Sequence, residues 1–256
     1  MSRHQASIVE QFTRQAAHFA EMPGHNDEQS LQLIIELCGL NPADVVLDVA
    51  CGSGIVARSF ARIAQRVTGI DITPAMLDEA RRLADLQGLT NTEWREGDVA
   101  DLPWPDESFS LVVSRYAFHH VLNPTRVLQE MVRVCRKSGR VALVDAVLPK
   151  EQLEAYNAFE KLLDPSHASA LSFDALDHLL ETSGLEDLQF SFYRMEMELE
   201  QQLATSFPGD GDAVKVRELL KDDIGFNRLG IGAHWRGEEL HYAYPVTVVV
   251  GKKPPT

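Results

Sequence analysis

Residues 46–57, Val-Leu-Asp-Val-Ala-Cys-Gly-Ser-Gly-Ile-Val-Ala, decide the fold of this 256-residue chain. The apolar run 45–49 is typical of a parallel strand that is buried on both faces. Gly52 and Gly54 then allow a tight turn and the close approach of a ligand, and residues 55–64 have the pattern of a helix. The stretch therefore predicts the first strand, turn and helix of a nucleotide-binding α/β sheet.

A second acidic residue follows the next short apolar strand, which ends at Asp71. A carboxylate at the carboxyl end of the strand beside the glycine turn can accept hydrogen bonds from both ribose hydroxyls of a nucleotide. The alternative role is a helix cap, but Thr73, followed by Pro74, is already placed to cap the next helix, 75–87. We therefore expect Asp71 to bind a ribose.

Two classes of cofactor use such a turn, because the spacing Gly52-x-Gly54-x-x-Ala57 also matches the dinucleotide fingerprint. Asp48 would face the pyrophosphate of a dinucleotide, whereas it would attract the ammonium group of a methionine moiety. The position of Asp48 therefore favours S-adenosylmethionine. After a third strand, 92–95, Asp98 can accept a hydrogen bond from an adenine amino group while Val99 lies against the ring. A turn-forming acid is the alternative at Asp98.

Beyond these residues, nearly the whole chain resembles the ubiquinone/menaquinone-biosynthesis-type branch of the class I S-adenosylmethionine-dependent methyltransferases. Residues 47–54 are similar to the first motif of that family, although Ala50 stands where Gly is usual. Residues 69–77 and 97–106 resemble its second and third motifs. Residues 133–140 resemble the helix-to-strand turn of the family, in which we expect Gly139 to take the left-handed position that ends the helix.

The resemblance implies S-adenosyl-L-methionine as the cofactor, S-adenosyl-L-homocysteine as its product, and a small-molecule acceptor. The residues that it places against the cofactor are Asp48, Ala50, Gly52, Gly54, Asp71, Ile72, Met76, Asp98, Val99 and Arg115. A closer likeness is to a little-characterised bacterial subgroup with the segments Arg115-Tyr116-Ala117-x-His119-His120 and Asp164-Pro165-Ser166-His167. This likeness does not imply a particular acceptor.

Composition restricts the partners. Lys and Arg number 24 against 38 Asp and Glu, a formal charge of −14, so a nucleic-acid partner is not expected. The three cysteines lie far apart, and no histidine stands at metal-ligand spacing, so we expect neither a metal nor a disulfide framework. Since no apolar run could span a membrane, we expect a cytoplasmic protein without a membrane partner. The sequence is compatible with a homodimer.

The order of the predicted elements indicates an α/β fold. Strands alternating with helices over 43–147 predict a doubly wound, mostly parallel cofactor-binding core, closed as a seven-stranded sheet by a pair of segments around 229–234 and 244–250. We expect a single methyltransferase domain over 1–256. Its other parts are expected to be a helical lid over 1–42, a cover of the acceptor pocket over 148–183 and 199–240, and an antiparallel last strand with a tail over 241–256.

Methyl transfer requires the acceptor atom to lie about 3 Å from the methyl carbon in a dry pocket. A histidine base helps if the acceptor is acidic. The candidate bases are His119, His120 and His167; we expect His120 to pack on the cofactor and the other two to contact the acceptor, with a purely structural role as the alternative for each. The expected walls of the acceptor pocket are Phe12, Phe19, His25, Tyr116 and Phe118.

The hypothesis favoured by these residues is methyl transfer to oxygen, nitrogen or activated carbon of a small, ring-bearing metabolite. One alternative is a non-catalytic protein that binds S-adenosylmethionine. The other is a short NAD(P)-dependent dehydrogenase, but such enzymes carry a Tyr-x-x-x-Lys pair near this region, and here Tyr116 is followed four residues later by His120.

Overall fold

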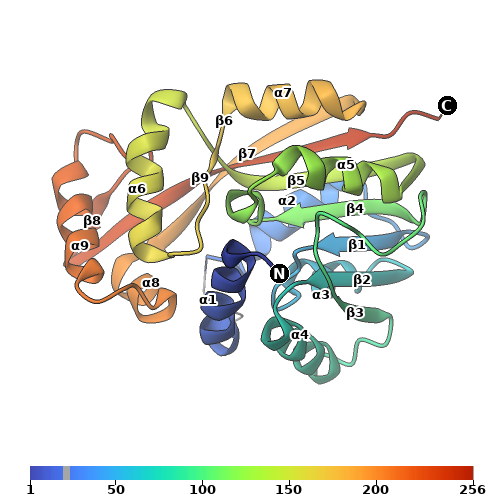
Figure 1. The fold of residues 1–256 in the computed structure, drawn as a ribbon, viewed down its shortest axis with the longest axis horizontal. Coiled ribbons are helices and arrows are strands. Elements are labelled where there is room, and N and C mark those ends of the chain that lie inside the picture. The colour runs from blue at the N-terminus through green and yellow to red at the C-terminus, as the bar shows by residue number, and fades with distance from the viewer. Residues whose placement is uncertain (20–23, 256) are drawn as a thin grey trace.

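The computed structural model describes residues 1–19 and 24–255, with the side chain of Phe19 outside the described part. A sheet with the strand order β3-β2-β1-β4-β5-β9-β7 crosses the molecule, and helices cover both of its faces (Figure 1). The strands are β1 Val45–Val49, β2 Arg66–Asp71, β3 Thr92–Glu96, β4 Phe109–Arg115, β5 Cys135–Leu148, β6 Leu171–Ser172, β7 Glu186–Glu198, β8 His234–Arg236 and β9 Glu239–Lys252.

The helices connect these strands in the alternating order that the sequence predicts. The α-helices are α1 Arg3–Phe19, α2 Glu28–Cys38, α3 Ile55–Phe60, α4 Pro74–Leu86, α5 Pro124–Val134, α6 Leu153–Leu163, α7 Phe173–Ser183, α8 Leu199–Ser206 and α9 Asp212–Asp223. Two short 3-10 helices lie at η1 Phe118–His120 and η2 Lys150–Gln152. The first five strands pair in parallel, and β9 pairs antiparallel with β5 and β7. The predicted fold class is confirmed.

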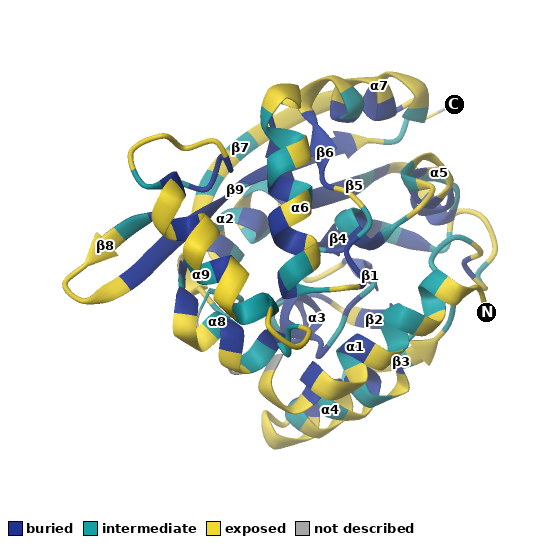
Figure 2. Ribbon diagram, turned by 60° about the vertical axis from the view of Figure 1, so that its left-hand side comes forward, coloured by how far each residue is buried: buried dark blue, intermediate teal, exposed yellow. Residues whose placement is uncertain are grey.

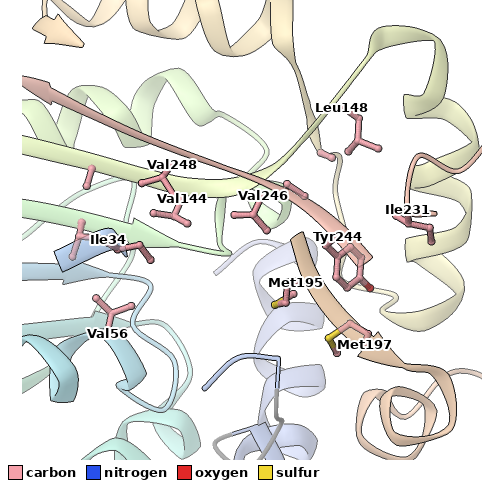
Figure 3. Packing of buried hydrophobic residues seen from close by; sticks show 14 of the residues in the cluster. Ile34, Val56, Val144, Leu148, Met195, Met197, Ile231, Tyr244, Val246 and Val248 are labelled. Atoms are coloured by element: carbon pink, nitrogen blue, oxygen red, sulfur yellow. The ribbon is translucent and has the colours of Figure 1, made fainter. Parts of the chain in front are cut away.

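Hydrophobic side chains fill both faces of the sheet. All five residues of β1 are buried, as a strand between two helical layers requires. One cluster of apolar residues includes side chains of α2, α3 and α6, and the other includes those of α5 and α7. Figure 2 shows buried residues along the central strands and exposed ones on the outer faces of the helices. In Figure 3, Met195 of β7 lies beside Tyr244 of β9, its partner in the sheet.

The closing strand pair differs from the prediction. Residues 229–234 do not form its first member, because Gly230 and Gly232 have φ angles of 75° and 59°, which interrupt an extended strand. Instead β9 lies between β5 and β7, and the short β8 forms a hairpin with its first residues. Strand β7 is the edge strand of the sheet on this side.

The predicted role of Gly139 as a helix-ending residue is also wrong. Helix α5 ends at Val134, and the left-handed residue of the turn is Ser138, with a φ of 56°. Gly139 lies within β5, where an added Cβ would be 2.7 Å from Cys135 Sγ and 2.9 Å from Ser110 O. The glycine is thus required by the close approach of neighbouring chain segments and not by its backbone conformation.

We expect Arg140→Ala to lower the free energy of unfolding by about 3 kcal/mol, because it would leave the buried Asp44 carboxylate without its cation. Arg140 also donates to the carbonyls of Cys38 and Gly39, each at 2.7 Å, and so joins α2 to β5. Urea unfolding of Arg66→Ala is the control: its ion pair with Glu93 is exposed, so a loss below about 1 kcal/mol is expected. Equal losses in the two variants would contradict this account.

Candidate active site

A cavity of about 320 Å³ lies at the carboxyl ends of β1 and β2. The strand order reverses here, since β1 lies between β2 and β4, and ligands of doubly wound sheets bind at such a point. Nine of the ten residues predicted to bind the cofactor line this first cavity, namely Asp48, Ala50, Gly52, Asp71, Ile72, Met76, Asp98, Val99 and Arg115. The tenth, Gly54, does not.

The Asp71 carboxylate organises the turn above β1. One of its oxygens accepts from the backbone N–H of Gly52 at 2.8 Å and the other from that of Thr73 at 2.8 Å. The turn is left-handed at Ala50 and Gly52, with φ angles of 57° and 51°. Thr73 is the N-cap residue of α4, as predicted, although its hydroxyl makes no capping hydrogen bond. A carboxylate has about four acceptor positions, so Asp71 retains capacity for a ligand.

Asp48 is buried at the floor of the first cavity, where its carboxylate accepts from the N–H of Ala57 at 2.9 Å. Burial raises the pKa of Asp48 to about 7, although the Ala57 hydrogen bond acts in the opposite direction. A cationic group in the cavity would favour the charged form of this carboxylate. The position therefore suits a ligand that carries a positive charge.

Gly54 has a packing role that the motif did not reveal. Its φ is 75°, and an added Cβ would lie 2.4 Å from Cη2 of Trp94, a residue of β3. The indole ring therefore lies against the glycine turn, and neither Gly54 nor Trp94 lines the first cavity. Gly54 makes room for Trp94, and its contact with the cofactor stays a prediction.

Helix α1 covers the first cavity, which Ser2, His4, Gln5, Ile8 and Phe12 help to line. The side-chain amide of Gln5 donates to Asp98 at 2.6 Å, and His4 Nε2 lies 2.7 Å from the backbone oxygen of His120. These contacts of His4 and Gln5 were not predicted, because a polar helix face gives no indication of which residues it will meet. Phe19, predicted to line the acceptor pocket, has its side chain outside the described part of the structure.

A second cavity, of about 90 Å³, adjoins the first. Four residues line both cavities: Phe12, His25, Tyr116 and His120. The other walls come from α6, α8 and the strands β5, β7 and β9. The sequence predicts Phe12, His25 and Tyr116 as walls of the acceptor pocket and His120 as a residue that packs on the cofactor, and all four lie where the two cavities meet.

His119, which is partly buried, pairs with the buried Asp145 in the second cavity, with 2.7 Å between His119 Nδ1 and Asp145 Oδ1. Burial alone would lower the pKa of His119, but the charge and hydrogen bond of Asp145 outweigh it, so the net effect is a raised pKa. Asp145 also accepts from the N–H of Phe118 at 2.7 Å. Sequence reasoning missed Asp145; its signal was an acid within the otherwise apolar fifth strand, 141–148.

His120 and His167 have different surroundings. His120 Nδ1 lies 3.1 Å from the carbonyl oxygen of Ser166, and burial lowers the pKa of His120 to about 4. His167 lines neither cavity: its Nε2 lies 2.8 Å from Asn157 Oδ1, and its ring is stacked 5.6 Å behind that of His119. His167 thus lies outside both cavities and beside His119, and its contact with the acceptor stays a prediction.

Phe118 is likewise not a pocket wall. Its side chain is 1% exposed and belongs to the hydrophobic cluster that includes α5 and α7. The residue after Tyr116 and Ala117 begins a 3-10 helix, so the alternation of a strand no longer applies at 118. Tyr116, with a φ of 57°, instead turns its hydroxyl to within 2.5 Å of the Tyr193 hydroxyl.

Arg115 joins the sheet to the segment that precedes α2. Its guanidinium donates to the carbonyl of His25 at 2.9 Å, to Ser30 Oγ at 3.3 Å and to the Tyr116 hydroxyl at 3.2 Å. Its carbon atom Cζ also lies 4.2 Å from the centre of the Tyr116 ring. The cation is therefore held in place at the edge of the first cavity by partners on three segments.

Among residues 1–19 and 24–255, no group of three or more His, Cys, Asp or Glu side chains is arranged to hold a metal ion. In the same part of the chain, no helix has the length and apolar character needed to cross a membrane.

The comparisons with known proteins agree with this geometry. Residues 47–143 match the family model described as a methyltransferase domain. The chain is 29% identical over 182 residues to the uncharacterized methyltransferase YcgJ of Bacillus subtilis, covering 70% of this chain and 72% of the relative. It is 29% identical over 191 residues to a demethylmenaquinone methyltransferase of Tropheryma whipplei, covering 72% of this chain and 78% of that protein.

Two solved structures share the fold. The crystal structure of YcgJ superimposes with a TM-score of 0.81 at 24% identity and covers 88% of this chain and 98% of that one. A putative methyltransferase of Bacillus halodurans gives a TM-score of 0.80 at 26% identity, with 88% and 99% covered. The fold and the cavity at its switch point thus define an S-adenosylmethionine-dependent methyltransferase of class I.

Within that class, residues 47–143 carry the methyltransferase domain, and the relatives that the chain resembles include quinone methyltransferases. The cofactor is S-adenosylmethionine, which argues against the dehydrogenase alternative. The residues of the first cavity fit this cofactor, because a buried carboxylate, Asp48, faces a space that a sulfonium-bearing amino acid would occupy with its ammonium group.

We expect S-adenosylhomocysteine, at about a hundred times its dissociation constant, to stabilise the protein by about 2.7 kcal/mol, whereas NAD and NADP should not.

Asp71→Asn should weaken S-adenosylhomocysteine binding by about tenfold or more, because charge-assisted hydrogen bonds are lost. Thermal unfolding and calorimetry measure both effects. Asp101→Asn is the control, since this exposed acid lies in the same motif region but does not line the cavity. Equal affinities of the two variants would contradict a ligand role for Asp71.

A second expectation concerns Gly54. Gly54→Ala should cost about 1–2 kcal/mol for the left-handed backbone and about 1–3 kcal/mol more for the clash with Trp94. Gly88→Ala is the matched control, because Gly88 has a φ of 66° and nothing within 4 Å of an added Cβ. Chemical unfolding of both variants separates the two contributions. If Gly54→Ala is no less stable than Gly88→Ala, Trp94 does not restrict this position.

Proposed function

We propose that this methyltransferase transfers the methyl group of S-adenosylmethionine to oxygen, nitrogen or activated carbon of a small, ring-bearing metabolite that binds in the second cavity. One observation carries the proposal: Phe12, His25, Tyr116 and His120 line both cavities. An acceptor in the second cavity would meet the cofactor between these four side chains. Such adjacency is what a displacement at a methyl carbon requires, because the enzyme contributes mainly position and exclusion of water.

The residues that line the second cavity favour an acceptor that contains a ring. Phe12, Tyr116, Tyr156 and Tyr244 supply four aromatic side chains, and Tyr156 and Tyr244 lie edge to face at 6.3 Å. Aromatic walls pack favourably on a ring in offset or edge-to-face arrangements. The quinone methyltransferases among the relatives act on ring systems according to their names, which agrees with this class of acceptor.

For the first cavity, we assign the ribose to Asp71, the adenine amino group to Asp98 and the methionine ammonium to Asp48. Arg115 is the candidate for the methionine carboxylate. No other Arg or Lys side chain among the described residues lines this cavity. When bound, the cofactor supplies an electrophilic methyl group. Every other contribution to the reaction comes from groups of the chain.

We assign His119 the role of proton acceptor. Its Nδ1 is engaged by Asp145, which leaves Nε2 as the atom that takes a proton from the acceptor. Asp145 stabilises the resulting imidazolium and fixes the orientation of the ring, and two backbone N–H groups, of Phe118 and Ala146, hold the carboxylate in turn. His120, with its low pKa, stays neutral near pH 7 and acts as a wall between the two ligands.

The domain organisation that we propose follows from the same contacts. The chain forms one methyltransferase domain in which α1 covers the cofactor and α6 and α8 cover the acceptor. Within the predicted cover 148–183, α6 contributes Tyr156 and Glu160 to the second cavity, whereas α7 packs beside α5. The lid and the cover meet where Gln15 of α1 donates to the carbonyl of Ser206 in α8, at 3.2 Å.

We expect His119→Gln to reduce turnover by about 10²–10⁴-fold while leaving the affinity for S-adenosylhomocysteine within a few fold. We expect Asp145→Asn to move the acidic limb of the pH profile of kcat to lower pH. The sign follows from the pair: Asp145 raises the pKa of His119, so its loss lets the neutral base form at lower pH.

The control for these measurements is His178→Gln, because His178 is exposed on α7 and lines neither cavity. Its turnover and pH profile should equal those of the unmodified protein. Radiolabelled methyl transfer into a metabolite extract identifies an acceptor for the assay. Full turnover of His119→Gln would show that the reaction needs no base and that positioning alone suffices.

A further inference from the structure

Three buried polar atoms without a hydrogen-bond partner face the same space. Among the described residues, Glu160 Oε1, Gln202 Oε1 and Ser206 Oγ have none, and all three residues line the second cavity. Glu160 is 9% exposed and Ser206 is 2% exposed. An unsatisfied buried polar atom costs roughly 1–3 kcal/mol, so three at one location indicate a site that a ligand completes.

The chemistry of these atoms restricts the ligand. A carboxylate oxygen and an amide carbonyl oxygen accept hydrogen bonds, and a serine hydroxyl can do so as well. The group that satisfies all three therefore presents several N–H or O–H donors. Because Glu160 comes from α6 while the other two come from α8, these acceptors converge between two helices.

The charged groups that line the second cavity narrow the class of ligand further. Of the described residues that line the second cavity, none is Lys or Arg, and three are carboxylic acids: Asp145, Glu160 and Asp164. Asp145 is paired with His119, whereas Asp164 Oδ2 lies 3.8 Å from Nε2 of His120, whose pKa burial lowers to about 4. Burial raises the pKa of Glu160 to about 7, and a cationic group beside this carboxyl would favour its charged form. The cavity therefore has acidic groups and no basic side chain of Lys or Arg among the described residues that line it. It disfavours an anionic ligand and favours a cationic one.

The aromatic side chains of the second cavity also favour a cationic ligand. Tyr156 and Tyr244 line the cavity together with Glu160, and the faces of such rings attract cations. A carboxylate with aromatic rings around it is well suited to an alkylammonium group, because the rings cover its methylene groups while the carboxylate meets its charge.

We propose that the acceptor carries an amino group, which Glu160, Gln202 and Ser206 bind as an ammonium ion at the end of the second cavity away from the cofactor. The methylated atom lies at the other end of the molecule, toward Tyr116 and His120, because these two residues line both cavities and the three binding residues line only the second. This assignment rests on the proposed function, since it presumes that the acceptor occupies the second cavity.

The test uses the protein saturated with S-adenosylhomocysteine and three probes with the same ring: benzylamine, benzyl alcohol and benzoate. We expect calorimetry to show that benzylamine binds about tenfold or more tightly than benzyl alcohol and that benzoate does not bind measurably. Glu160→Gln should weaken benzylamine about tenfold and remove the preference for the amine. Glu154→Gln, an exposed acid on the same helix, should change neither affinity.

These measurements separate a failure of this inference from a failure of the proposed function. Absence of benzylamine binding, equal affinities for the amine and the alcohol, or an unchanged preference in Glu160→Gln would each overturn this inference while S-adenosylhomocysteine still binds. Failure of S-adenosylhomocysteine to bind the unmodified protein would instead contradict the proposed function. If Glu160→Gln does not fold, as circular dichroism would show, Ser206→Ala replaces it, with an expected threefold or greater loss for benzylamine and no loss for S-adenosylhomocysteine.

Discussion

The hydrogen bonds that the Asp71 carboxylate accepts from Gly52 and Thr73 hold together the two segments on which the first cavity depends. One oxygen fixes the turn after β1, and the other fixes the start of α4. Because both segments leave the sheet at its carboxyl edge, their separation determines the width of the cavity between them. The left-handed backbone at Ala50 is tolerated within this arrangement, although an alanine there is unfavourable by itself.

The sequence predicted the fold and the first cavity well, because both depend on local patterns. A buried strand, a glycine turn and an acid after each of the next strands follow directly from residue order, and nine of the ten predicted residues line that cavity. Gly54 is the exception, and its surroundings depend on a residue outside its motif: Trp94, on a strand forty residues later, packs against it. A contact between distant segments has no local signal.

The second cavity was less predictable for the same reason. Its polar residues Asp145, Glu160 and Gln202 come from one strand and two helices, and only the fold brings them together. Adjacent histidines illustrate the point, because His119 and His120 are neighbours in the chain yet have pKa values shifted in opposite directions. The difference arises from Asp145, whose position opposite His119 depends on the register of β4 and β5.

The wall shared by the two cavities has a thermodynamic consequence. Phe12 belongs to α1, so a shift of that one helix changes the shape of both binding spaces at once. When binding of the cofactor moves α1, the free energy of that movement contributes to the binding of the acceptor as well. By linkage, each ligand then changes the affinity of the other by the same factor. The binding of cofactor and acceptor should consequently be cooperative even though no residue needs to bond to both.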